Sequence, residues 1–217
     1  MVDATLTNAP LGSGGAALHA PSALRSPFLG HTAGERPNAA AQIGVQLTAS
    51  VLPSVTLIST WISGLPGLLE AMATVFGAAL PTHTGKTMQT ALGLLLRSGP
   101  EEFVLLGDDP TDRCALLRAS IGADIGAVTD LSHARCRIHI TGTACRSTLN
   151  KLFALDLREA RLAIGDVALT GTHHVPSMLH RLGVDAFDLY VFSTYAHDQL
   201  GTLLDAALEY GVVLQAT

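Results

Sequence analysis

The chain has 217 residues, of which 13 are Lys or Arg and 18 are Asp or Glu, so its formal net charge is -5. This balance argues against broad nucleic-acid binding, because a protein that neutralises phosphates needs a basic face. Only 14% of the residues are charged, against roughly 25% in an ordinary soluble domain. So few charges predict an apolar surface that another chain covers. The length fits one large domain or two small, closely joined ones.

Residues 1–45 are rich in Ala, Gly, Pro and Ser and show no sustained periodicity. Such a segment buries too little apolar surface to offset the entropy of ordering it, so we expect a flexible lead-in, with residues 25–29 as a candidate anchoring stretch. The first residues lack the basic and apolar regions of a secretory signal, and no apolar run reaches the ~18 residues of a membrane span. We therefore expect a cytoplasmic protein with reduced thiols.

Two successive sets of elements are predicted after this lead-in. In the first set, apolar residues recur on one face of a helix at 65–76, which Gly77 ends. In the second set, residues 135–141 alternate cleanly between apolar and polar, as in a strand with one buried face. Both sets read strand, helix, strand, strand, helix. The predicted elements lie at 54–59, 65–76, 87–97, 103–106 and 109–121, and then at 127–131, 135–141, from 142 onward, within 167–182, at 187–192 and at 200–211.

A residue-level repeat supports this division. The pattern L-x-R-x-G-x-acid-x-F-x-L occurs at 95–105 and again at 179–189. Each copy predicts a β-hairpin with Gly in the turn, and an internal duplication or convergent turn chemistry can produce it. The fold class is therefore predicted to be α+β, with two ferredoxin-like split-βαβ units, at 46–125 and 126–217, packed together. Their junction is where we expect a ligand or partner groove.

Two glycine motifs are partial matches to nucleotide-binding loops. Residues 85–87 read Gly-Lys-Thr, like the end of a P-loop, but Leu80 stands where the first glycine of that loop is required. Residues 12–17 loosely fit a dinucleotide fingerprint, but no strand precedes them and no helix follows. We interpret the first motif as a loop that leads into a strand and the second as a linker.

Histidines and cysteines give no strong metal signal. His173 and His174 are adjacent, so on a regular strand they point to opposite faces, and with His180 they lack a nearby third ligand type. Structural or hydrogen-bonded histidines are the favoured interpretation, and no metal site is predicted. The cysteines show no CxxC spacing and are predicted to be small buried side chains; they are Cys114, Cys136 and Cys145.

Asp130, Ser132 and His133 supply the residue types of a catalytic triad within four consecutive positions. A triad needs its members to converge from separate elements, which neighbours on one strand and turn cannot do. Asp130 and Ser132 can share one face and bond nearby amides. A structural turn is therefore favoured over a ligand-facing or partner-facing role for these three residues, and no catalytic residue is predicted on this chain.

Three segments resemble a known family. Residues 127–157 resemble the DxSH…(I/V)xG…L…xDL stretch of folate-dependent aminomethyltransferase-like proteins, and residues 99–105 resemble a GPDEWLL segment. Residues 174–211 resemble the C-terminal part of the gamma subunit of heterotetrameric sarcosine oxidase, and the resemblance runs from about Ser22 to the end. Phe103 replaces the Trp of the family pattern, and Asp185 is predicted to be a turn residue where the transferases have an aspartate that acts on folate.

The resemblance implies an accessory subunit of a flavoenzyme complex. Such a complex oxidises sarcosine to glycine, transfers the one-carbon unit to tetrahydrofolate and forms hydrogen peroxide. The implied partners are alpha, beta and delta subunits, chiefly alpha. Those chains would carry FAD, FMN, NAD, tetrahydrofolate and zinc, and this chain would bind no cofactor. Two alternatives remain: a gamma-type subunit of a related N-methyl amino acid dehydrogenase, and a free-standing folate-binding module with Asp130 or His133 near the pterin.

Overall fold

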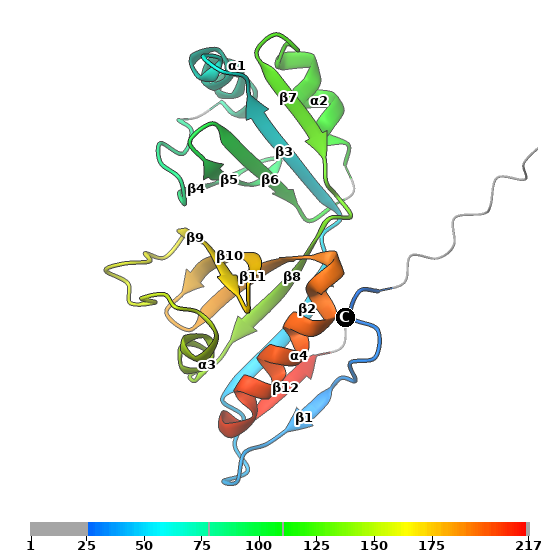
Figure 1. The fold of residues 1–217 in the computed structure, drawn as a ribbon, viewed down its shortest axis with the longest axis vertical. Helices are drawn as coiled ribbons and strands as arrows, with labels where there is room; N and C mark the ends of the chain where they lie inside the picture. Colours follow the sequence, from blue (N-terminus) through cyan, green and yellow to red (C-terminus); the bar gives the residue numbers. More distant parts are fainter. Residues whose placement is uncertain (1–25, 78, 110, 216–217) are drawn as a thin grey trace, which may run out of the picture.

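The computed structural model describes residues 26–77, 79–109 and 111–215. Two β-sheets face each other, and helices cover the outer side of each sheet (Figure 1). One sheet has five strands and the other has seven. The mixed α+β fold with two packed units, predicted from the sequence, is confirmed.

The five-stranded sheet has the strand order β4-β5-β6-β3-β7. This unit comprises β3 (Ser54–Thr60), α1 (Leu65–Phe76), β4 (Thr87–Thr90), β5 (Gly93–Gly99), β6 (Glu102–Gly107), α2 (Arg113–Ser120) and β7 (Gly126–Asp130). Leaving out the edge strand β4, the order is that of a ferredoxin-like fold, with its two helices on one face.

The seven-stranded sheet has the strand order β1-β12-β2-β8-β11-β10-β9. Its elements are β1 (Gly34–Arg36), β2 (Val45–Val51), β8 (Arg135–Thr141), α3 (Cys145–Leu152), β9 (Val167–Thr172), β10 (Val175–Gly183), β11 (Ala186–Phe192), the 3-10 turns η1 (Ser193–Tyr195) and η2 (Leu208–Tyr210), α4 (Ala196–Ala207) and β12 (Val212–Gln215). Here β8, β10, β11 and β12 repeat the ferredoxin-like arrangement, with β2 inserted between β12 and β8.

The two sheets exchange strands across the predicted boundaries of 46–125 and 126–217. Strand β2 lies almost entirely within the predicted first unit, yet it belongs to the seven-stranded sheet, where it pairs antiparallel with β8 and parallel with β12. Strand β7 lies at 126–130 but pairs with β3 in the five-stranded sheet. The chain therefore crosses between the sheets at 52–53 and again at 131–134. The alternation of apolar and polar residues is the same for a strand in either sheet. The sequence pattern therefore does not tell which sheet a strand joins.

The prediction of a flexible lead-in over 1–45 is wrong for its described part. Phe28 is 7% exposed and belongs to the apolar core of the seven-stranded unit. Strand β1 pairs with β12, and Val45 is fully buried. The physical reason is that tertiary packing supplies the apolar partners that the local composition lacks. Residues 1–25 lie outside the described part of the chain.

Three predicted elements have different bounds in the structure. Residues 87–97 and 167–182 were each expected to hold one strand, but each holds an antiparallel pair, β4 with β5 and β9 with β10. The second helix was expected to begin at Asp109, whereas α2 begins at Arg113. The Asp112 carboxylate caps it by accepting a hydrogen bond from the Ala115 amide at 3.1 Å.

Apolar side chains form three clusters. Helices α1 and α2 pack on the five-stranded sheet, and α3 and α4 pack on the seven-stranded sheet. The third cluster joins the two sheets and includes Val55, Leu96, Val104 and Met178. All three cysteines are free and buried, as the sequence predicts for small apolar side chains. Burial raises the pKa of the Cys145 thiol to about 11.

The two copies of the repeat fold as equivalent hairpins. In β5–β6, Arg97 pairs with Phe103 and a bulge follows before Gly99; in β10–β11, Arg181 pairs with Phe187 and a bulge follows before Gly183. Each arginine is buried and lies over the ring of the phenylalanine that it pairs with. The repeated residues therefore serve the same structural purpose in both units.

These arginines fasten a loop to each sheet. Nη1 of Arg97 donates to the carbonyl of Thr82 at 2.8 Å, in the connection that follows α1. Nη1 of Arg181 donates to the carbonyl of Leu162 at 2.8 Å, in the connection that follows α3. A planar guanidinium with several donors suits the capture of several carbonyls at once.

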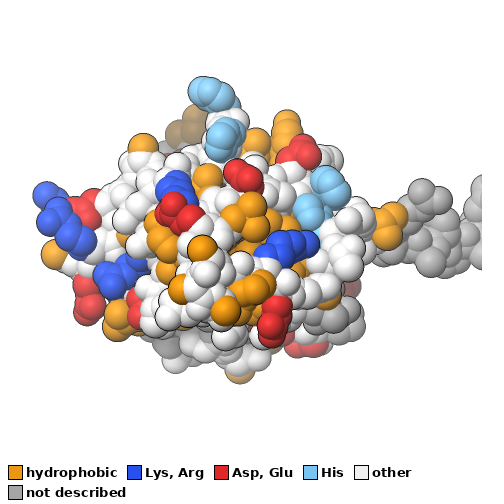
Figure 2. All heavy atoms as spheres, turned by 90° about the horizontal axis from the view of Figure 1, so that it is seen from below, with side chains coloured by type: hydrophobic (Ala, Val, Ile, Leu, Met, Phe, Trp, Pro, Cys, Tyr) orange, Lys and Arg blue, Asp and Glu red, His pale blue; other side chains and the backbone are white. Residues whose placement is uncertain are grey.

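The surface in Figure 2, seen from below the seven-stranded unit, interleaves acidic and basic side chains with apolar ones. This face therefore has no continuous basic area of the kind that a protein needs to neutralise phosphates. None of the helices in the described part of the chain has the length and apolar character that a membrane crossing requires.

Candidate functional site

Asp130 and Ser132 lie at the second crossing between the sheets, where β7 ends. The carboxylate of Asp130 accepts hydrogen bonds from the Ser132 hydroxyl at 2.5 Å and from the Ser132 amide at 2.9 Å. These bonds lower the pKa of Asp130, the hydroxyl contributing most. The Ser132 oxygen in turn accepts from the Val55 amide at 3.3 Å. The motif therefore holds the crossing segment against the start of β3.

His133 is exposed and stands apart from this hydrogen-bonded pair. Its backbone carbonyl accepts a hydrogen bond from the Ser193 hydroxyl at 2.8 Å, and its ring acts on Asp130 only through a weaker electrostatic effect. All three predicted residues line a cavity of about 270 Å³ between the crossing segment and α2. The structure thus brings Asp130 and Ser132 together as a turn, and the ligand-facing or partner-facing role of the three stays a prediction.

This cavity does not assemble a nucleophile with a base. The Cys114 thiol lies 3.4 Å from the Thr56 hydroxyl, and its position is buried. Arg113 is also buried, with its guanidinium held by the Leu92 carbonyl and by the Asp109 carboxylate at 2.7 Å. A triad needs a base that is hydrogen-bonded to its nucleophile. Among the described residues, the hydrogen bonds of Cys114 and Arg113 include no such base.

The histidine group considered for a metal is spread over two places. His173 and His174 form the two-residue turn between β9 and β10, where both have positive φ, whereas the sequence pattern placed them on a strand. His180 is buried on the inner face of β10. Among residues 26–77, 79–109 and 111–215, no three His, Cys, Asp or Glu side chains lie close enough together to hold a metal ion.

Residues 85–87 form a junction between the two units. The Lys86 ammonium lies 2.7 Å from the Asp166 carboxylate, the Val167 amide donates to the Gly85 carbonyl at 2.7 Å, and the Thr87 hydroxyl donates to the Gly165 carbonyl. These contacts tie the start of β4 to the start of β9. The predicted loop that leads into a strand is confirmed, with a bridging role that the sequence did not show.

Asp185 lies in the turn between β10 and β11, as predicted. Its carbonyl accepts a hydrogen bond from the Gly142 amide at 3.1 Å, and its carboxylate lies 3.4 Å from Arg146 Nε. These contacts join the turn to the loop before α3, which is a structural role.

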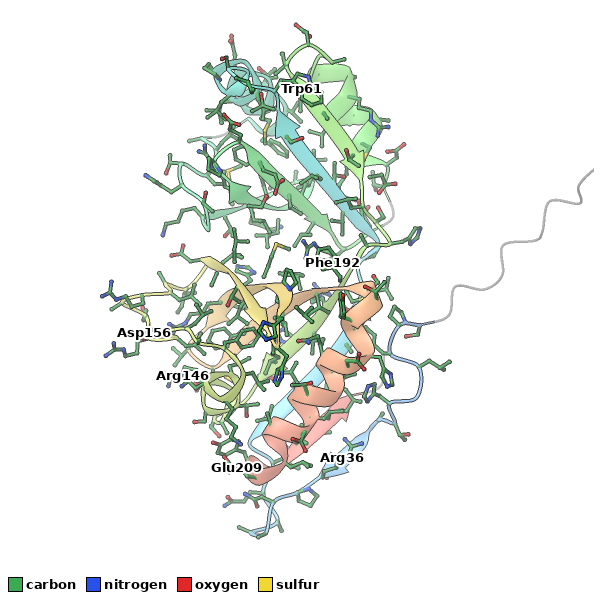
Figure 3. All side chains as sticks on the ribbon, in the orientation of Figure 1. Arg36, Trp61, Arg146, Asp156, Phe192 and Glu209 are labelled. Carbon is green, nitrogen blue, oxygen red and sulfur yellow. The ribbon has the colours of Figure 1, made fainter. Side chains whose placement is uncertain are left out.

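A cavity lies at the predicted junction of the units. It measures about 550 Å³ and is lined from both sheets, with Val104 and Glu102 on one side and Met178 and Phe192 on the other. Figure 3 shows Phe192 between the two layers. The Arg135 guanidinium lies 4.2 Å from the centre of the Phe192 ring, and burial lowers the pKa of Arg135.

Sequence reasoning missed a polar group on the inner face of the seven-stranded sheet. His139 and Asp188 are joined at 2.6 Å, and Tyr190 donates to the same carboxylate at 3.2 Å. The residues come from β8 and β11, which the chain separates widely. The sequence does carry a sign of this group in β10–β11, where His180, Asp188 and Tyr190 alternate with the apolar residues of the repeat.

No protein-family model matches the chain. The chain is 26% identical over 145 residues to the sarcosine oxidase subunit gamma of Corynebacterium sp. strain P-1, covering 66% of this chain and 71% of that protein. It is also 26% identical over 141 residues to the sarcosine oxidase subunit gamma of an Arthrobacter species, covering 64% of this chain and 70% of that protein. The chain is a relative of sarcosine oxidase gamma subunits. The resemblance predicted from the motifs is therefore confirmed.

Solved structures agree with this relation to sarcosine oxidase gamma. A chain of heterotetrameric sarcosine oxidase from Corynebacterium sp. U-96, solved with pyrrole 2-carboxylate, superposes with a TM-score of 0.70 and 25% identity, covering 86% of this chain and 95% of that one. The aminomethyltransferase T of the glycine cleavage system from Bartonella henselae superposes with a TM-score of 0.56 and 15% identity, covering 80% and 48%. The second likeness shows the fold alone. Together the relatives support a gamma-subunit role within an oxidoreductase complex.

Proposed function

We propose that this chain is the gamma-type structural subunit of a heterotetrameric sarcosine oxidase. The observation that carries the proposal is the superposition on 95% of one chain of that enzyme at a TM-score of 0.70. In the assembled complex, sarcosine would be oxidised to glycine, with the one-carbon unit passed to tetrahydrofolate and hydrogen peroxide formed. The FAD, FMN, NAD, folate and zinc that this chemistry uses would be held by the other chains.

A structural role agrees with what the polar residues of the described chain do. Asp130 and Ser132 hold the crossing between the sheets, Lys86 joins the two units, and Arg97 and Arg181 fasten loops. Each of these groups already has protein partners. The low share of charged residues, 14%, also suits a chain that buries surface against other subunits.

We place the main contact with an alpha-type chain at the tip between β3 and α1. Ile62 is 93% exposed and Trp61 is 51% exposed, and the next residue, Ser63, has a positive φ of 69°. Figure 3 shows Trp61 at the end of the molecule far from the seven-stranded sheet. A large apolar side chain at the centre of an interface contributes most when it is fully desolvated there.

Co-expression with alpha-, beta- and delta-type chains tests the proposal. We expect the four chains to co-purify and to oxidise sarcosine in preference to N-methylglutamate. Ile62→Asp should weaken assembly because it buries a charge at the contact. Val184→Asp is the matched control, since Val184 is 53% exposed in the turn between β10 and β11 of the other unit, and it should assemble normally.

Two outcomes would contradict the proposal. One is a chain that stays a stable monomer and never co-purifies with an alpha-type chain. The other is a rise in the unfolding temperature of the isolated chain with tetrahydrofolate, because a ligand that binds only the native state must stabilise it. That second result would support the free-standing folate-binding module instead.

A further inference from the structure

A row of polar side chains crosses the inner face of the seven-stranded sheet. In the strand register, Thr48 lies opposite His139, His139 lies opposite Asp188, and Asp188 lies opposite His180. These four residues come from β2, β8, β11 and β10 in spatial order. A second row beside it places Arg137 between Ser50 on β2 and Tyr190 on β11.

The carboxylate of Asp188 is the centre of this group. The Asp188 side chain is 7% exposed, and its two oxygens are held by Nδ1 of His139 at 2.6 Å and by the Tyr190 hydroxyl at 3.2 Å. Burial raises the pKa of Tyr190, so its phenol stays protonated and donates. A carboxylate offers about four acceptor positions, so two bonds leave capacity for a ligand.

His180 lies beside Asp188 and is 5% exposed. Its Nδ1 is buried and has no hydrogen-bond partner among the described residues. Burial lowers the pKa of this imidazole, which keeps it neutral. A buried ring nitrogen without a partner is costly. The residue His180 lines a cavity of about 190 Å³ together with Arg137 and Asp188.

The β5–β6 hairpin, which is the other copy of the repeat, carries apolar residues at the positions of His180 and Asp188. In the repeat, His180 and Asp188 correspond to Leu96 and Val104, which face each other in the same register in β5–β6. Those two residues belong to the apolar cluster between the sheets. The residues that face the helices are the same in both copies. A paired apolar site commonly stabilises as well as a buried ionic one, so the polar set points to a ligand.

Two cavities share lining residues in this group. The larger measures about 360 Å³ and is lined by Thr48, Ser50 and His139, and it shares Arg137, Leu182 and Asp188 with the smaller one. The Arg137 guanidinium is 32% exposed and pairs with Asp108, which is 80% exposed, at 3.0 Å. Exposed ion pairs are weak, so the guanidinium can turn to a ligand.

The groove thus presents a cation on β8 and a buried anion on the neighbouring strand β11. We propose that it binds a small α-amino acid in its zwitterionic form, with the ligand carboxylate on Arg137 and the ligand ammonium on Asp188. Ser50 supplies a hydroxyl donor to the carboxylate side, and His139 positions Asp188. The proposal concerns this chain alone and does not depend on assembly with other subunits.

Glycine titrated into the purified full-length chain is the direct test, with acetate and methylamine as half-ligands at constant ionic strength. Calorimetry should give a dissociation constant for glycine at least ~tenfold lower than for either half-ligand, because each lacks one of the two charges. Absence of heat and of a rise in unfolding temperature with glycine would overturn the proposal. So would acetate that binds as tightly as glycine.

Variants separate the site from a general salt effect. Arg137→Gln should weaken glycine binding at least ~tenfold, whereas Arg158→Gln should leave it unchanged, since Arg158 is 81% exposed and pairs with Asp156. Equal weakening by both would contradict the proposed contact.

A variant that carries the apolar residues of β5–β6 tests whether the polar group serves binding or folding. His180→Leu/Asp188→Val/Tyr190→Phe should unfold at or above the temperature of the unaltered chain and should lose glycine binding. Earlier unfolding would show that the polar set is structural, and retained glycine binding would show that the ammonium does not bind there; either result overturns the inference.

Discussion

Removing the buried guanidinium of Arg181 should destabilise the seven-stranded unit strongly. The side chain is 1% exposed, and its nitrogens donate to the carbonyls of Gly183 at 3.0 Å, Leu162 at 2.8 Å and Leu157 at 3.2 Å. In Arg181→Met, the apolar stem is kept but these carbonyls lose their donor. Each buried acceptor left without a partner costs about 1–3 kcal/mol, partly offset because a buried charge is also removed, so we expect a net loss of about 3–5 kcal/mol.

Urea unfolding of the full-length chain measures this loss. Arg158→Met is the matched control, because Arg158 is 81% exposed and pairs with Asp156 two residues away; its replacement should leave the urea midpoint nearly unchanged. If Arg181→Met unfolds within about 1 kcal/mol of the unaltered chain, the loop is not held by the guanidinium and the structural reading of the repeat fails.

Three further predictions concern single positions. Gly85→Ala should cost more stability than Gly165→Ala: both glycines have positive φ, but a Cβ at Gly85 meets the Val167 carbonyl at 2.7 Å, whereas one at Gly165 meets nothing within 4 Å; equal losses in thermal unfolding would contradict the close approach. The Cys145 thiol, with its pKa raised to about 11, should resist alkylation at pH 8 until urea is added, as peptide mass spectrometry would show. The pKa of His180 is lowered by burial from its ordinary 6.5, so the unfolded chain takes up a proton that the folded chain refuses and stability falls as pH drops below 6.5; His180→Leu should flatten that slope, and an unchanged slope would assign it to other groups.

The helices and hairpins that the sequence predicts well are those with local signals. Helix α1 begins at Leu65 and ends at Phe76, as its apolar spacing and Gly77 indicate. Gly77 takes the left-handed conformation with φ of 63°, which closes the last turn. The repeated hairpins are likewise fixed by residues within one short stretch, so the pattern reveals them directly.

Strands β2 and β12, which the sequence did not predict, are held by distant partners. Strand β2 alternates regularly, with Val45, Leu47 and Ala49 buried, yet it follows a segment of low-complexity composition and pairs with β8, far along the chain. Strand β12 is only four residues long and is sheltered between β1 and β2. Register and sheet membership are properties of the assembled sheet, which local periodicity cannot specify.

The candidate site divides in the same way. The interaction of Asp130 with Ser132 is local, and the sequence predicts it as a turn. The group around Asp188 depends on the register of four strands, so no contiguous sequence motif predicts it. Comparison of the two hairpins position by position would have found it, since His180 and Asp188 stand where the first copy has Leu96 and Val104.

The two hairpins have the same residues on the side that faces the helices and different residues on the side that faces the other sheet. On the side that faces the helices, each hairpin needs an arginine to satisfy loop carbonyls and a phenylalanine beneath it, so both copies carry the same residues. On the inner side, the only requirement is to fill space against the opposite sheet, which Leu96 and Val104 already meet. A buried carboxylate beside a neutral imidazole in that position adds desolvation cost without adding packing. Its presence in one copy alone is therefore explained by binding rather than by folding.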